Sequence, residues 1–157
     1  MSNMEKLKLG SKLPKFTGTD QLGNEINSEH LNGKRVVVYF YPKDNTPGCT
    51  AQACSIRDSF SDLNEKGIVV IGISTDSISS HKKFGDKFNL PFSLLPDEDK
   101  MISQTFGVWG EKKFMGKTYD GIHRTSFLFD EDSTLKCVID KPNTKDHGNE
   151  ILKNYGF

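Results

Sequence analysis

The sequence predicts an α/β fold in which a mixed central sheet carries helices on both faces, with a β-hairpin ahead of it. Two apolar runs, residues 36–41 and 68–74, indicate strands that are buried on both faces. A segment with helical spacing joins them, which makes a βαβ unit with parallel strands and a right-handed crossover. Two later runs, residues 125–129 and 135–139, flank a polar turn and indicate an antiparallel hairpin.

Composition limits the class of protein. The 157 residues, 34% hydrophobic and with 11 Phe, indicate a single folded domain over residues 1–157. The 21 positive and 21 negative residues cancel, and no basic stripe is visible, so we expect neither nucleic acid nor a membrane as partner. Residues 1–15 lack the apolar segment of a signal peptide, and no run approaches the ~20 apolar residues of a membrane span. We therefore expect a cytoplasmic protein.

The first part of the chain contains short elements. Residues 17–19 and 25–27 lie on either side of Gly23 and Asn24, which predicts an N-terminal β-hairpin. Residues 28–32 predict one helical turn before the first buried strand.

The elements after that strand alternate between helix and strand. We expect, in order, a helix from about 48 to 66, the strand 68–74, a helix capped by Asp76 or Ser77 and running to about Phe88, a strand over 91–95 and a short helix over 97–106. Residues 107–122 are rich in Lys and Gly and are expected to form a loop. After the hairpin described above, residues 144–155 predict a last helix that Gly148 weakens.

Cys49 stands where the strand 36–41 gives way to a helix. The strand stops at Pro42, a polar loop follows, and Cys49 comes at the start of the helical pattern. The thiolate is the nucleophilic form of cysteine, and a helix N-terminus favours an anion through its unpaired N–H groups and its dipole. Thr46, three residues earlier, can direct a hydroxyl toward a group that meets the sulfur. This position favours chemistry over the alternative of an inert buried thiol.

The three cysteines do not form the disulfide framework of a small secreted protein, because their number is odd. In a reducing compartment a disulfide would be transient and catalytic. Cys49 and Cys54 are five residues apart, which on an intact helix places their Cα atoms about 8.6 Å apart, beyond the ~7 Å limit for a disulfide. The pair can bridge only if the first helical turns unwind. Alternatively, Cys54 is an apolar residue of the core face, and for Cys137 a buried inert thiol is the favoured interpretation.

A metal site is not expected. The four histidines are scattered and do not pair with the cysteines in the spacing of a zinc site: His30, His81, His123 and His147. Taken by itself, Arg124 is as well interpreted as a surface arginine before a strand. Trp109 and Phe114 fit core packing at least as well as a docking face.

Taken together, these residues resemble the peroxiredoxins, which are thiol peroxidases with a thioredoxin-like fold. Pro42-x-x-x-Thr46-x-x-Cys49 is similar to their active-site motif. Two further features are similar to the bacterioferritin-comigratory, or Q-type, branch of this family. They are Cys54 and a second motif, Gly116-Lys117-x-Tyr119-x-Gly121-Ile122-x-Arg124. The resemblance implies that Cys49 is the peroxidatic cysteine and Cys54 the resolving one. It also implies that Thr46 hydrogen-bonds the peroxide, that Arg124 is the cation of the site, and that Pro42 belongs to it. The sequence departs from many members at Gln52, where they carry Glu.

The resemblance further implies an activity. The enzyme would reduce hydrogen peroxide and organic hydroperoxides to water and alcohols, through a Cys49 sulfenic acid and then a Cys49–Cys54 disulfide. Thioredoxin or a similar dithiol protein would restore the thiols, the protein would be a monomer, and no metal, haem or flavin would be needed. Two other classes stay open: a peroxide sensor or holdase, and a thiol–disulfide oxidoreductase. The lack of a Cys-x-x-Cys pair counts against the last.

Overall fold

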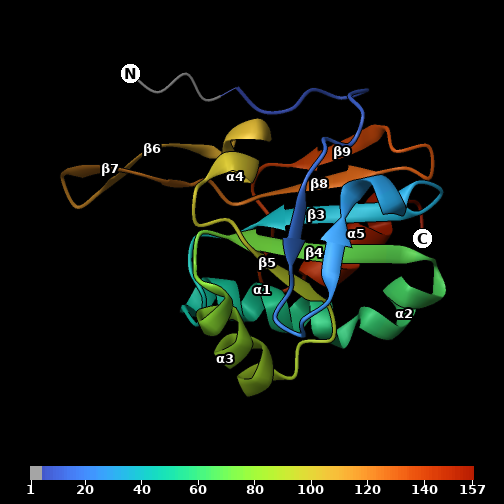
Figure 1. Ribbon diagram of the computed structural model, residues 1–157, viewed down its shortest axis with the longest axis horizontal. Helices are drawn as coiled ribbons and strands as arrows, with labels where there is room; N and C mark the ends of the chain where they lie inside the picture. The colour runs from blue at the N-terminus through green and yellow to red at the C-terminus, as the bar shows by residue number, and fades with distance from the viewer. Residues whose placement is uncertain (1–4) are drawn as a thin grey trace.

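The computed structural model describes residues 5–157 and has a five-stranded mixed sheet in the order β5-β4-β3-β8-β9 (Figure 1). The strands are β3 (Arg35–Phe40), β4 (Ile68–Ser74), β5 (Ser93–Pro96), β8 (Thr125–Phe129) and β9 (Leu135–Ile139). The first three run parallel, and β8 pairs antiparallel with both β3 and β9. The predicted βαβ unit and C-terminal hairpin are thereby confirmed. Residues 1–4, which open the segment considered for a signal peptide, lie outside the described residues.

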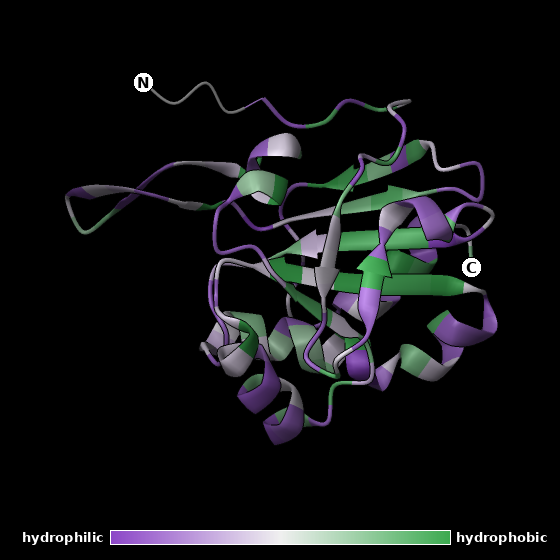
Figure 2. Ribbon diagram, viewed as in Figure 1, coloured by the Kyte–Doolittle hydropathy of each residue, from purple (hydrophilic) through white to green (hydrophobic). Residues whose placement is uncertain are grey.

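Alternate side chains of β3 supply two cores, one on each face of the sheet. One face carries Val37 and Tyr39 and is covered by four helices, α1 (Pro47–Asp58), α2 (Phe60–Glu65), α3 (Ile78–Phe88) and α5 (His147–Asn154). The other face carries Val38 and Phe40 and packs against the short helix α4 (Met101–Thr105) and the N-terminal segment. Figure 1 shows the four helices gathered on one side, and Figure 2 shows the central strands as the most hydrophobic part of the molecule. The predicted α/β class with helices on both faces is confirmed.

The N-terminal hairpin is also present. Strands β1 (Thr17–Thr19) and β2 (Glu25–Asn27) pair antiparallel, and the predicted helical turn follows as the 3₁₀-helix η1 (Ser28–Leu31). The predicted helix over 97–106 is shorter than expected, because Asp97 stays outside it and accepts hydrogen bonds from the backbone N–H groups of Ile102 and Ser103 at 3.0 and 2.7 Å. None of the described helices is long and apolar enough to cross a bilayer.

The single helix predicted from 48 to 66 is wrong, because Ser59 divides it into α1 and α2. The N–H of Ser59 is shared between the carbonyls of Ser55 and Ile56, both at 3.2 Å, and the backbone leaves the helical region there. The start of α5 packs against this point, where the N–H of Gly148 donates to Ser55 Oγ at 3.0 Å. Sequence spacing could not show the division, since it coincides with a contact to a segment about ninety residues away.

Gly148 is required by this contact, so Gly148→Ala is expected to destabilise the fold. A Cβ at this position would lie 2.6 Å from Ser55 O and 2.4 Å from Ser59 Oγ. Glycine to alanine in an open helix usually stabilises by up to ~1 kcal/mol, but overpacking of this kind costs about 1–3 kcal/mol. Urea unfolding measures the difference, with the exposed neighbour change Asn149→Ala as control. A Gly148→Ala protein as stable as the parent would show that α5 does not need this close approach.

The loop predicted over residues 107–122 is wrong. These residues form an antiparallel hairpin of β6 (Trp109–Phe114) and β7 (Lys117–Ile122), which projects from the body of the molecule (Figure 1). Its turn is Met115-Gly116, and both residues have positive φ, 51° and 78°, as a tight hairpin turn requires. Core packing is also wrong for Phe114, which is 66% exposed near the tip, whereas Trp109 is half-buried at the base.

Candidate active site

Cys49 lies in the first turn of α1 and is buried, with only 2% of its surface exposed. Arg124, which lies between β7 and β8, places its Nη2 3.3 Å from Cys49 Sγ. Gly48 makes this approach possible, because a Cβ at residue 48 would lie 3.2 Å from the same nitrogen. The structure therefore brings together a thiol, a helix N-terminus and a guanidinium, and the last two each favour negative charge on the sulfur.

Gln52 is the second partner of Arg124. Its Oε1 accepts a hydrogen bond from Arg124 Nη1 at 2.6 Å, so the two nitrogens of one guanidinium bind Gln52 and Cys49 side by side. Gln52 is fully buried, and its Nε2 has no hydrogen-bond partner among the described residues. The neutral side chain thus orients Arg124 without adding a negative charge next to the sulfur.

The hairpin that the sequence did not predict holds the segment that carries Arg124. The N–H of His123 donates to Val108 O at 2.8 Å, and His123 Nε2 lies 3.0 Å from Glu111 O. On the other side of Arg124, Thr125 is the first residue of β8, and its Oγ1 donates to His123 O at 2.8 Å. His123 therefore helps to fix the backbone next to Arg124.

Pro42 and Thr46 shape the loop before Cys49. Pro42 offers no N–H and follows Tyr41, the first residue after β3, whose N–H donates to Ile73 O at 3.1 Å. Thr46 is the N-cap residue of α1, but its hydroxyl donates to Lys43 O at 2.8 Å and does not cap the helix. Because the hydroxyl proton is used in this way, the oxygen of Thr46 can accept a hydrogen bond from a hydroperoxide. The loop's Lys43 is exposed.

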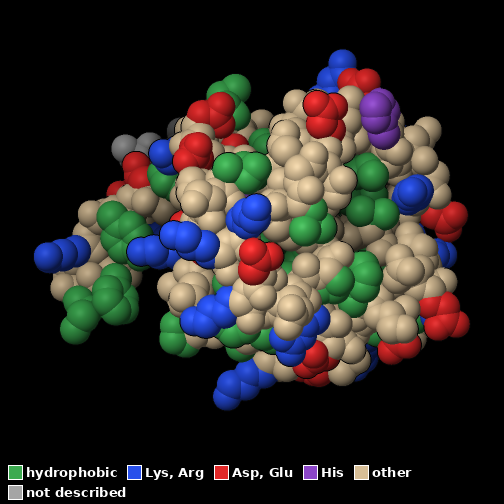
Figure 3. Space-filling model, turned by 60° about the horizontal axis from the view of Figure 1, so that its bottom comes forward, with side chains coloured by type: hydrophobic (Ala, Val, Ile, Leu, Met, Phe, Trp, Pro, Cys, Tyr) green, Lys and Arg blue, Asp and Glu red, His purple; other side chains and the backbone are tan. Residues whose placement is uncertain are grey.

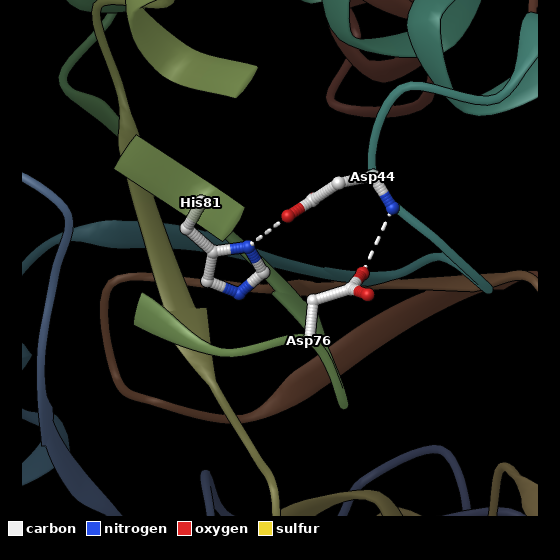
Figure 4. Close-up of side chains that lie close together, drawn as sticks. All are labelled: Asp44, Asp76 and His81. Atoms are coloured by element: carbon white, nitrogen blue, oxygen red, sulfur yellow. Dashed lines mark hydrogen bonds and ion pairs between the residues drawn. The ribbon is translucent and has the colours of Figure 1, made fainter. Parts of the chain in front are cut away.

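Asp44 fixes this loop to α3, in a cluster that the sequence analysis missed (Figure 4). Its carboxylate accepts hydrogen bonds from Tyr41 OH at 2.5 Å and Ser80 Oγ at 2.8 Å, and lies 2.7 Å from His81 Nδ1. The N–H of Asp44 donates to Asp76 Oδ2 at 2.8 Å. A signal for His81 was present in its spacing of three from Phe84, which places both on the buried face of α3.

Three residues of this cluster could offer atoms to a metal ion. One ligand atom each of Asp44, Asp76 and His81 lie within 4.8 Å of one another. However, the Asp44 carboxylate is already occupied by three hydrogen-bond partners, and His81 uses the nitrogen that faces it. The geometry therefore supports a structural role, in which the Asp44 cluster attaches the loop before α1 to α3.

Cys54 lies on the same helix as Cys49 and is half-buried, and all three cysteines are free thiols. With α1 continuous from Pro47 to Asp58, the two thiols share an intact helix, as the spacing argument assumed. Cys137 is half-buried on β9, with its Sγ 3.5 Å from Asn154 Oδ1, and burial raises the pKa of its thiol. The raised pKa keeps Cys137 protonated at neutral pH, which agrees with an unreactive thiol although it is less buried than expected.

Two buried polar side chains complete the surroundings of the site. The Tyr39 hydroxyl has no hydrogen-bond partner among the described residues, and burial, followed by the charge of Cys49, raises its pKa well above the ordinary value. Burial also lowers the pKa of His147, whose Nε2 lies 2.7 Å from Ser126 Oγ. Both groups are therefore neutral at pH 7 and leave the charge of the site to other residues.

Comparison with known proteins extends these observations over most of the chain. The model of the AhpC/TSA family matches residues 9–138. The sequence is 50% identical over 149 residues to peroxiredoxin Bcp of Escherichia coli strain K12. This alignment covers 95% of this chain and 96% of the relative. Among solved structures, peroxidoxin BcpB from Mycobacterium tuberculosis aligns with a TM-score of 0.81 and 31% identity, covering 94% of this chain and 96% of that one. The bacterioferritin comigratory protein of Xanthomonas campestris aligns with a TM-score of 0.82 and 29% identity over 88% of each chain.

The protein has a thioredoxin-like fold and free cysteines, and it is related to these peroxiredoxins. These features define a thiol-dependent peroxidase. The chain belongs to the AhpC/TSA family of peroxiredoxins, within its bacterioferritin-comigratory or Q-type branch.

Proposed function

We propose that Cys49 is the peroxidatic thiol of a thioredoxin-dependent peroxidase, and that Cys54 resolves the oxidised form. The observation that carries this assignment is the 3.3 Å distance between Arg124 Nη2 and Cys49 Sγ at the N-terminus of α1. We further propose that Thr46 and Arg124 bind the peroxide, that Pro42 shapes the loop, and that residues 1–157 act as one domain.

The first step is an attack of the Cys49 thiolate on one oxygen of the peroxide. A sulfur–oxygen bond forms, the O–O bond breaks, and the departing oxygen leaves with a proton as water or an alcohol. Thr46 Oγ1 can accept the hydrogen bond of the O–H, and Arg124 can stabilise the negative charge that develops on the departing oxygen. The product on the enzyme is the Cys49 sulfenic acid.

Thiolate formation alone explains little of such a rate. For a thiol whose pKa falls from ~8.5 to ~6, the thiolate fraction at pH 7 rises about thirty-fold, while the intrinsic nucleophilicity falls about ten-fold. The remaining gain is only a few-fold. The main contribution of the site is therefore to hold the peroxide in line and to stabilise the leaving oxygen.

The second step joins Cys49 to Cys54 and needs a change of backbone. The Cys54 thiolate attacks the sulfenic sulfur, water leaves, and a disulfide forms, but the intact helix keeps the two residues too far apart. The first turn of α1 must open, which breaks the bond from Thr50 N–H to Thr46 O, now 2.8 Å long. Asp44 stays tied to α3 in the proposed change, so that the opening begins after it.

The partners of the proposed enzyme follow from this cycle. A thioredoxin or a similar dithiol protein would reduce the Cys49–Cys54 disulfide by thiol exchange. Because one chain supplies the whole constellation, we propose that the protein works as a monomer, in the cytoplasm where such reductants act. Organic hydroperoxides are included as substrates with hydrogen peroxide, since the related Xanthomonas campestris protein is described for alkyl peroxide reduction.

The variant Cys54→Ser tests this cycle. The parent protein should consume many equivalents of peroxide with thioredoxin, thioredoxin reductase and NADPH. Cys54→Ser should react once, at a similar rate, and then hold a Cys49 sulfenic acid, because the proposed resolving thiol is missing. Mass spectrometry after dimedone labelling measures the trapped acid, and Cys137→Ser is the matched control with full turnover.

The outcomes separate the rival functions. Normal cycling of Cys54→Ser would show that another thiol resolves Cys49. A parent protein that stops after one equivalent of peroxide would indicate a sensor or holdase, and insulin reduction without peroxide would indicate a thiol–disulfide oxidoreductase.

A further inference from the structure

Lys112, on β6, has an unusual place for a lysine on a projecting hairpin. Its neighbours on both strands are largely exposed, whereas Lys112 is half-buried and its Nζ donates to Ile122 O at 2.9 Å. Gly121 provides the room for this bend, since a Cβ there would lie 3.1 Å from Lys112 Cδ. The side chain therefore folds back across the hairpin toward its base.

The carbonyl that Lys112 binds belongs to the segment that carries Arg124. Ile122 ends β7 and is two residues before Arg124, and His123 between them is held by Val108 O and Glu111 O. Lys112 adds a further attachment to this segment, and it is made by a charged group. Loss of this bond removes the Lys112 partner of the Ile122 carbonyl and loosens the backbone next to Arg124.

The charge of Lys112 also acts on the site. Burial, followed by the positive charge of Arg124, lowers the pKa of Lys112, while Cys49 raises it. A positive charge in this place stabilises negative charge that is present or develops in the site. The interaction adds to the contact of Arg124 with the sulfur at 3.3 Å.

Apart from Arg124 before β8, the other titratable groups of this neighbourhood supply no positive charge. They are Tyr39 on β3, Asp44 in the loop after β3, Cys54 on α1 and His147 on α5. Tyr39 and His147 are neutral at pH 7, for the reasons given above. Asp44 is paired with its partners on α3.

We propose that Lys112 is a positioning residue of the peroxidase site, which holds the Arg124 segment through Ile122 O and supplies a second positive charge near Cys49. The proposal rests on the proposed role of Cys49 and Arg124. The proposal gives the β6–β7 hairpin a role in positioning the site. The tip of this hairpin carries exposed hydrophobic side chains, which are seen beside lysines at the left of Figure 3.

The test compares Lys112→Met with Lys113→Met. Neighbouring residues of a strand point to opposite faces, and Lys113 is exposed. The substitution Lys113→Met therefore removes an equal charge from the same strand. In a background where Cys54 and Cys137 are serine, the rate of Cys49 alkylation by iodoacetamide is followed against pH. Lys112→Met should move the midpoint of this curve upward by about half a pH unit, since one positive charge that acts through a high effective dielectric is removed. Lys113→Met should leave it unchanged.

Peroxide kinetics give the second measurement. In the chain with all its cysteines, Lys112→Met should reduce the second-order rate with hydrogen peroxide about ten-fold, less than the loss of a group that binds the departing oxygen. Lys112→Arg keeps a charged donor and should recover most of the rate, whereas Lys112→Gln should recover less and leave the alkylation midpoint shifted. The circular dichroism spectrum and unfolding midpoint show whether each variant is folded.

The outcomes distinguish the role of Lys112 from the proposed peroxidase function of Cys49. An unshifted midpoint and unchanged rate in folded Lys112→Met, or an equal effect of Lys113→Met, would overturn the role of Lys112. If Cys49→Ser still consumed peroxide, the proposed role of Cys49 would fail, whatever Lys112 does.

Discussion

Cys49→Ser is expected to lose peroxide reduction almost completely, by at least about 10⁴-fold, as when other enzymes lose their nucleophile. A serine hydroxyl is not ionised at neutral pH even beside Arg124, so it cannot attack the O–O bond as the thiolate does. The substitution is close to isosteric in a site where the side chain is only 2% exposed, so the fold should persist. Stopped-flow measurement of hydrogen peroxide consumption, with the protein in excess, checks the loss.

The matched control is Cys137→Ser, which removes a thiol from β9, outside the proposed site. It should leave the reaction with peroxide unchanged, because burial keeps that thiol protonated. If Cys137→Ser lost the reaction and Cys49→Ser kept it, the assignment of the reacting sulfur would have to be exchanged.

Arg124→Met is expected to reduce the rate with hydrogen peroxide by about 10²–10³-fold, the usual loss when one donor to a developing oxyanion is removed. The variant takes away the cation that lies 3.3 Å from Cys49 Sγ and leaves the Oε1 of buried Gln52 without its partner. The unpaired amide should also lower the free energy of unfolding by about 1–3 kcal/mol. Second-order rate constants and urea unfolding on the same preparation separate the two effects.

Arg124→Lys and Arg35→Met complete this experiment. Lysine keeps the positive charge but cannot bind Gln52 and the sulfur with two nitrogens of one planar group, so it should recover only part of the rate. Arg35 lies at the start of β3 and binds Lys66 O at 2.8 Å, so its loss removes an arginine without touching the site. A folded Arg124→Met protein with the rate of the parent would exclude Arg124 from the reaction.

Much of the fold could be predicted from sequence because the sheet is built from strongly apolar runs. Strands β3 and β4 are buried on both faces and leave no ambiguity between strand and surface loop. The hairpin β6–β7 gave no such signal, because it projects into solvent and has polar residues on both faces, so that no alternation with a core side exists. Its turn, Met115-Gly116, also lacks the Asn-Gly or Asp-Gly pair by which tight hairpin turns are usually found.

The candidate site was predictable to a similar extent. The sequence placed Cys49 at a helix N-terminus and gave Thr46 and Cys54 by their spacing from it. It could not choose between a surface arginine and a site cation for Arg124, because the contact joins residues 75 apart in the chain. The roles of Lys112 and of the Asp44 cluster were equally invisible, since each depends on side chains from different elements.

The sequence by itself determined that a cysteine would stand at the junction between a buried strand and a helix, because hydrophobic periodicity and proline positions are local properties of the chain. Only the tertiary structure decided which charges surround that sulfur. Arg124 reaches Cys49 because the return of β8 beside β3 and the β6–β7 hairpin set the position of its backbone. A charge acts through space over a few ångströms, and such distances are fixed by packing rather than by order along the chain.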